Sequence, residues 1–63
     1  MEDYQKRVVE EKVELDKKIT NLDIFIRSEG FAQVVPNERV RLTEQFDIMN
    51  KYSKILEDRI NNF

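Results

Sequence analysis

Apolar positions between Leu42 and Phe63 recur every three or four residues, which is the spacing of one face of an α-helix. No Gly or Pro interrupts this stretch. Its apolar stripe consists of Leu42, Phe46, Met49, Tyr52, Leu56, Ile60 and Phe63. Ile48 and Ile55 lie beside the stripe and widen it, so the predicted helix has more apolar surface than one neighbouring helix can cover.

A similar pattern occupies the first half of the chain. Its stripe consists of Tyr4, Val8, Leu15, Ile19, Leu22 and Ile26. Val9 and Val13 form a second apolar pair beside this stripe, and Asp3 is a suitable N-terminal cap. The spacing of three or four residues also places Lys12 on this stripe, between Val8 and Leu15. Its side chain either extends out of the stripe into solvent or faces a buried anion. We favour the extended lysine.

The one glycine and the one proline of the chain both fall between the two patterns. Gly30 suits the left-handed position just after a helix, and Pro36 suits the first turn of the next helix. We therefore predict helices over residues 4–28 and 37–61, joined by a loop over residues 29–36. A loop this short makes the two helices antiparallel neighbours.

With 63 residues, the chain is one domain near the lower size limit for folding alone. Because both apolar stripes are broad, copies of the chain are expected to bury surface against one another. The predicted fold is all-α, an antiparallel two-helix hairpin that assembles into a homo-oligomeric helical bundle. The residues expected at the oligomer interface are Val9, Val13, Phe46, Ile48, Met49 and Ile55.

The composition excludes several classes of function. The chain has no Cys and no His, so disulfides, thiolate nucleophiles and the usual zinc ligands are absent. A net charge of −2 argues against a broad surface for duplex nucleic acid. There is no apolar run long enough for a membrane span, and we expect no signal peptide, because no apolar region follows the charged start of the sequence. We expect a cytoplasmic protein that is not an enzyme and uses no metal or cofactor.

Charged and polar residues beside the stripes have two interpretations each. Glu14 and Lys18 are spaced to pair across one helical turn. Tyrosine next to Lys or Arg can stack on a base and grip phosphate, and this combination occurs around Tyr4 and Arg7 and around Tyr52. Such groupings are also ordinary surfaces of an amphipathic helix. Three polar residues border the C-terminal stripe, where they either make local hydrogen bonds and rim ion pairs or face a second subunit or ligand: Gln45, Ser53 and Arg59.

Both halves of the chain resemble a family of small uncharacterised phage proteins related to a crAss-like phage product. The C-terminal half carries Gln-x-x-x-Met-x-x-Tyr-x-x-Ile-Leu-x-x-Arg-Ile over residues 45–60. The N-terminal half carries Arg-Val-Val-Glu-Glu-Lys-Val-Glu-Leu over residues 7–15, followed by Lys-Ile-x-x-Leu-x-x-Phe-Ile over residues 18–26. The resemblance covers most of the chain.

More distantly, the layout is similar to the helical hairpin of phage anti-CBASS and anti-Thoeris sponges. Their C-terminal helix carries Leu-Gln-x-Gly-x-Met, and here Gln45 and Met49 keep that spacing while Asp47 replaces the glycine. Tyr4 and either Lys17 or Lys18 are counterparts of their early Tyr and Lys. Those proteins assemble, commonly as hexamers, and sequester cyclic nucleotide signals without cleaving them.

This second resemblance implies a phage-encoded anti-defence protein that binds cyclic di- or trinucleotides in the host cytoplasm and forms dimers or larger assemblies, up to a hexamer. The residues that it implies for ligand binding are Tyr4, Arg7, Lys18, Tyr52 and Arg59. The alternative function is a small helical module that binds or inhibits a host or phage protein through its broad apolar faces.

Overall fold

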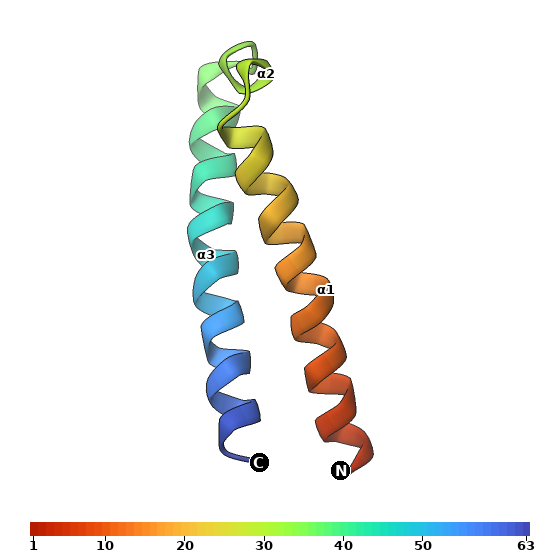
Figure 1. Cartoon of the computed structure of the whole chain (residues 1–63). Coiled ribbons are helices and arrows are strands. Elements are labelled where there is room, and N and C mark those ends of the chain that lie inside the picture. The colour runs from red at the N-terminus through yellow and green to blue at the C-terminus, as the bar shows by residue number, and fades with distance from the viewer.

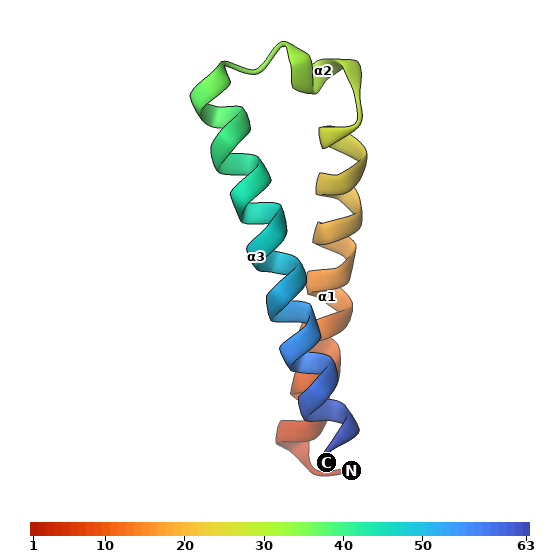
Figure 2. The ribbon, with the colours of Figure 1, turned by 90° about the vertical axis from the view of Figure 1, so that its left-hand side faces the viewer.

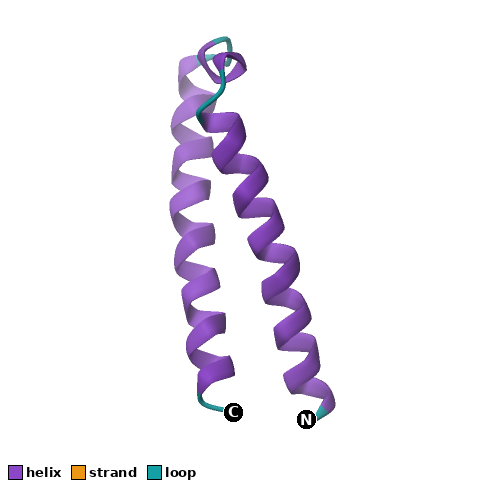
Figure 3. Ribbon diagram, in the orientation of Figure 1, coloured by secondary structure: helices purple, strands orange, loops and turns teal.

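In the computed structural model, which describes residues 1–63, the chain consists of three helices and no strands (Figure 3). Helix α1 spans Asp3–Ile26, α2 spans Glu29–Ala32 and α3 spans Pro36–Asn61. The prediction of an all-α chain is therefore confirmed. Both long helices begin one residue before the predicted start, and the first one ends two residues earlier than expected.

The long helices α1 and α3 lie side by side and run in opposite directions, with both chain ends at the same end of the molecule (Figure 1). A turn by 90° shows that α2 bridges the other end and that the two helices cross at an angle (Figure 2). The molecule measures 45 × 15 × 13 Å, so it is only about one helix pair thick. Few side chains can be fully enclosed in such a shape.

The helix ends follow the local chemistry with one correction. Glu2, not Asp3, is the N-cap of α1, and its backbone N–H donates to Oε1 of Gln5 at 2.8 Å. Pro36 occupies the first position of α3, as predicted, and Val35 before it is extended with φ −57° and ψ 144°. Glu2 takes the cap because Gln5, three residues later, can satisfy its free N–H.

The predicted loop over residues 29–36 contains the short helix α2. Gly30 lies inside α2 and has no positive φ, so the predicted left-handed conformation is wrong. Helix α1 ends where the Ser28 hydroxyl donates to the Phe25 carbonyl at 2.6 Å. Phe31 packs edge-on against Phe25, with ring centroids 5.9 Å apart, so it folds back onto the last turn of α1. This aromatic contact holds α2 in place without a glycine turn.

The core is thin and consists of the contact between α1 and α3, which we call the seam. The buried residues are Val8, Leu56 and Ser53, and Leu56 has no exposed surface at all. Most residues of the two predicted stripes face this seam. Three of them are exposed instead, namely Tyr4 at 52%, Tyr52 at 41% and Phe63 at 43%. On α3 the seam position expected for Tyr52 is taken by Ser53. Its small hydroxyl side chain fits between the helices, whereas a tyrosine ring there would push them apart.

The six residues predicted for an oligomer interface divide into two groups. Val13, Ile48 and Ile55 are exposed, at 48%, 65% and 58% of their surface. The other three are half-buried within the single chain: Val9, Phe46 and Met49. Phe46 and Met49 belong to the seam with α1, so of the six residues only Val13 on α1 and Ile48 and Ile55 on α3 leave most of their apolar surface exposed.

Candidate functional site

Three polar side chains meet in the middle of the seam. Lys12 Nζ lies 2.8 Å from Asp16 Oδ2 and donates to Ser53 Oγ at 3.0 Å. The Ser53 hydroxyl in turn donates to Asp16 Oδ1 at 2.6 Å. Each of the three residues therefore contacts the other two, and Ser53 of α3 joins the Lys12–Asp16 pair of α1. A cluster whose members satisfy one another stabilises one register of the helix pair and leaves little capacity for a ligand.

The cluster changes the interpretation of Lys12. Its side chain is only 23% exposed and contacts a carboxylate, so the favoured prediction that it extends into solvent is wrong. The hydrogen bonds from Lys12 and then Ser53 lower the pKa of Asp16 below its usual value of 3.8, against an opposing effect of burial. Asp16 was not singled out from the sequence. Its position four residues after Lys12 was the available signal.

The lowered pKa of Asp16 predicts acid sensitivity. The stabilisation is complete above pH 3.8 and is lost as pH falls through the lower pKa of the folded state. Because the Asp16 side chain is 47% exposed, we expect it to contribute less than about 1 kcal/mol. Thermal melts followed by circular dichroism at pH 6 and pH 2.5 should show a smaller acid-induced loss in Asp16→Asn than in wild type. An equal loss in the two proteins would contradict this role.

Tyr4 and Phe63 join the helices at the end that holds both termini. Their rings pack edge-on with centroids 5.8 Å apart and planes at 78°. We call the side of the helix pair on which they meet the aromatic face. With 3.6 residues per turn and the helices antiparallel, all five residues predicted to bind ligand fall on or beside this face. They are Tyr4, Arg7 and Lys18 of α1 and Tyr52 and Arg59 of α3.

The cations of the aromatic face have no carboxylate partner in the chain. Arg7, Lys18 and Arg59 are exposed and form none of the four ion pairs of the structure. The contacts of Tyr4 with Phe63 and of Ser53 with the α1 cluster set the register of the helices. Arg7 then lies level with about position 60 and Lys18 with about position 49, so Arg7 and Arg59 share one end of the face. Lys18 and Tyr52 lie nearer its middle.

Three other sequence predictions about side-chain contacts have clear outcomes. Glu14 pairs with Lys17 at 3.3 Å, not with Lys18, so the predicted Glu14–Lys18 pair is wrong. Lys18 is left free because Lys17 reaches Glu14 across three residues. Gln45 makes a local contact of 3.7 Å from its amide nitrogen to Sδ of Met49. Arg59 makes no ion pair with Glu57 within the chain.

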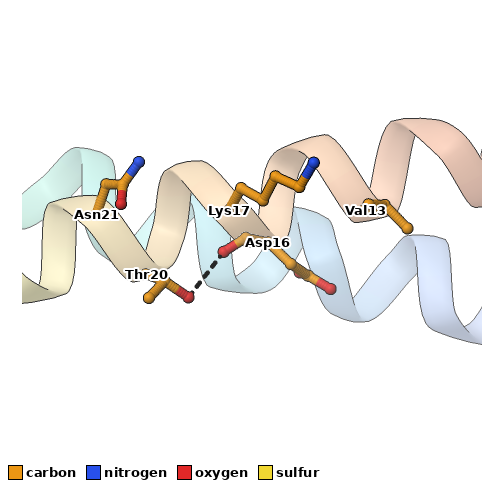
Figure 4. A pocket seen from close by; sticks show the side chains of 5 residues that line it. All are labelled: Val13, Asp16, Lys17, Thr20 and Asn21. Atoms are coloured by element: carbon orange, nitrogen blue, oxygen red, sulfur yellow. Dashed lines mark hydrogen bonds between the residues drawn. The ribbon is translucent and has the colours of Figure 1, made fainter.

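Two open depressions lie away from the aromatic face. One runs along α1 alone, where Thr20 donates to the backbone oxygen of Asp16 at 3.0 Å (Figure 4). Its lining residues are Val13, Asp16, Lys17, Thr20 and Asn21. The other lies where Phe31 meets the start of α3, beside Arg39, whose Nε is buried without a hydrogen-bond partner. Neither depression encloses space between the two long helices.

No helix is both long enough and apolar enough to cross a bilayer. No three Asp or Glu side chains gather as a group that could hold a metal ion. Together, the fold and the aromatic face define a small all-helical protein with two long antiparallel helices and a surface of free cations and tyrosines.

This chain belongs to the Sequestin family, whose model matches residues 2–62. It is also similar to a 7.5 kDa protein of Enterobacteria phage T4, described as uncharacterized and encoded in the denB-rIIB intergenic region. The two chains are 42% identical over 60 residues, which cover 95% of this chain and 94% of the phage protein. No solved structure matches the chain. These matches confirm the resemblance to a family of small phage proteins.

Proposed function

We propose that this chain is a phage-encoded protein that binds and sequesters a cyclic oligonucleotide immune signal in the host cytoplasm without cleaving it. The family name suggests sequestration, and the similarity to a T4 protein supports a phage origin. The observation that carries the proposal is the grouping of three unpaired cations and two tyrosines on the aromatic face. These are the residue types that bind phosphates and bases.

The chemistry of sequestration requires binding groups only. Arg7 and Arg59 can each donate two parallel hydrogen bonds to a phosphate, and Lys18 adds a third positive charge. Tyr4 and Tyr52 offer flat surfaces on which bases stack, worth about 1–3 kcal/mol per base. A protein that holds the signal in this way lowers its free concentration below the level that an effector needs.

A single chain displays these groups on an open surface. Glu11, also exposed, lies one turn from Arg7 on α1 and would repel a phosphate that was bound loosely there. Enclosure by a second copy would exclude water and strengthen the charged hydrogen bonds. We therefore propose that the binding species is a dimer or larger homo-oligomer, formed through the exposed apolar residues Ile48 and Ile55, which lie on the same side of α3 as Tyr52 and Arg59.

Calorimetry with a panel of cyclic di- and trinucleotides tests this function. We expect tight binding of at least one of them, and intact nucleotide on release from the heat-denatured complex. Arg59→Ala should weaken binding roughly tenfold to a hundredfold, because it removes charge-assisted hydrogen bonds. Lys54→Ala is the matched control, since Lys54 is an exposed, unpaired cation on another face of α3. Recovery of hydrolysed nucleotide would contradict sequestration.

The second candidate function is a module that binds a host or phage protein. The observation in its favour is the number of apolar side chains that one chain leaves exposed, among them Ile24 at 62% and Ile48 at 65%. If no cyclic nucleotide gives heat on titration, the ligand-binding proposal fails and this alternative takes its place.

A further inference from the structure

Helix α3 carries a second apolar stripe that points away from the seam. Ile48, Tyr52 and Ile55 are spaced by four and then three residues and are 65%, 41% and 58% exposed. They lie on one side of α3, about 40° to 100° around the helix from the buried Leu56. A stripe of this spacing is the kind of surface that packs against another helix.

The stripe is bracketed by one acidic and one basic residue. Glu44 lies one turn before Ile48, and Arg59 lies one turn after Ile55. Both side chains are exposed, and neither takes part in an ion pair within the chain. They are fifteen positions apart on one straight helix, or about 22 Å, so they cannot reach each other in the same molecule.

The spacing of these residues is symmetric about one point. Ile48 and Ile55 are equally distant from the midpoint between Lys51 and Tyr52, and Glu44 and Arg59 are equally distant from the same midpoint. Two such helices packed antiparallel about that midpoint would bring each Ile48 opposite an Ile55. The same arrangement would bring each Glu44 opposite an Arg59, twice by symmetry.

We infer that this outer stripe of α3 pairs with the same stripe of a second copy, in an antiparallel arrangement held by two Glu44–Arg59 ion pairs between the copies. The occupant is a second copy and not another protein, because the stripe is complementary to itself in the spacing of its residues and in charge. Tyr52 of each copy then lies beside the two-fold axis. The two Lys51 residues meet at the rim, where their ammonium groups can extend into water.

The inference rests on the self-association proposed above, but not on the identity of any ligand. It adds that the partner copy completes the aromatic face. Tyr52 and Arg59 of both copies lie along the same contact, so a ligand bound there would touch residues of two chains. The guanidinium of Arg59 has five N–H donors, so one edge can pair with Glu44 of the second copy while another edge binds a phosphate. A cyclic dinucleotide of two identical nucleotides has two-fold symmetry, as this pair of copies does.

Charge-swap variants test the pairing by sedimentation velocity at micromolar concentrations. Glu44→Arg and Arg59→Glu each place like charges opposite one another in a homodimer, so each alone should weaken association at least about tenfold. In an equal mixture, the first variant brings two cations to the contact and the second brings two carboxylates. Both ion pairs of the mixed dimer then join opposite charges, so the mixture should associate like wild type. The double variant E44R/R59E should also recover, and no contact within one chain can produce either recovery.

Asp47→Arg and Lys54→Glu are the matched controls, since they change charge by the same amounts on other faces of α3. They should leave association within about twofold of wild type. If wild type associates but the mixture and the double variant do not recover, the α3 pairing is wrong while self-association stands. If wild type is a folded monomer, the α3 pairing and the proposed self-association are both wrong. Calorimetry still reports on ligand binding separately.

Discussion

Substitution of Val8 by Asp is expected to unfold the protein. Val8 is only 5% exposed and is one of the two apolar side chains buried between α1 and α3. The nearest cation in the seam is Lys12, one turn away on α1, and it is already paired with Asp16. An Asp at position 8 therefore has no free partner, and an uncompensated buried charge costs about 3–5 kcal/mol. A single core in a chain of this size supplies no more than about 3–5 kcal/mol of net stability. Far-UV circular dichroism should therefore show loss of most of the helical signal.

Val13→Asp is the matched control for this substitution. Val13 is on the same helix but 48% exposed, so a carboxylate there stays hydrated in the single chain. We expect the helical signal to remain. A Val8→Asp protein with wild-type helicity and melting temperature would show that the seam between α1 and α3 is not the source of stability.

Leu56→Ala is expected to cost about 2–5 kcal/mol, because Leu56 has no exposed surface and its truncation leaves a cavity. A loss of this size should leave a large unfolded fraction at room temperature. Urea denaturation followed by circular dichroism, at a fixed protein concentration, measures the change in the free energy of unfolding. The concentration must be fixed because association would itself add stability.

Val40→Ala provides the comparison on the same helix. Val40 is 56% exposed, so its truncation should change the free energy of unfolding by less than about 0.5 kcal/mol. Similar losses in Leu56→Ala and Val40→Ala would contradict the burial pattern. A larger loss in Val40→Ala would point to a contact that covers the start of α3 in an assembly.

The two long helices could be predicted because their periodic apolar positions and the single Gly and Pro agree with each other. The seam of α3 was harder to predict at one step, because Tyr52 and Ser53 are neighbours and hydrophobicity favours Tyr52. Ser53 faces α1 because its hydroxyl contacts both Lys12 and Asp16 there. Such pairing depends on residues from two helices and cannot be read from either one alone.

The short helix α2 was missed for a related reason. Four residues carry too little periodicity to predict a helix, and Gly30 alone suggests a turn. The Phe25–Phe31 contact that holds α2 against α1 is tertiary. The candidate binding residues could be named from residue types and the resemblance. That they share one face, with Arg7 and Arg59 at one end, depends on the register that the Tyr4–Phe63 contact sets.

Because both termini lie at one end of a 45 Å rod, the position of a tag matters for experiments on this protein. A purification tag or fluorophore on either terminus sits next to Tyr4, Arg7 and Phe63 and can block the aromatic face. A dye attached through a cysteine introduced into α2 sits at the far end of the rod. The chain has no native cysteine that would compete for the dye. Labelling there would report binding and assembly without obstructing either.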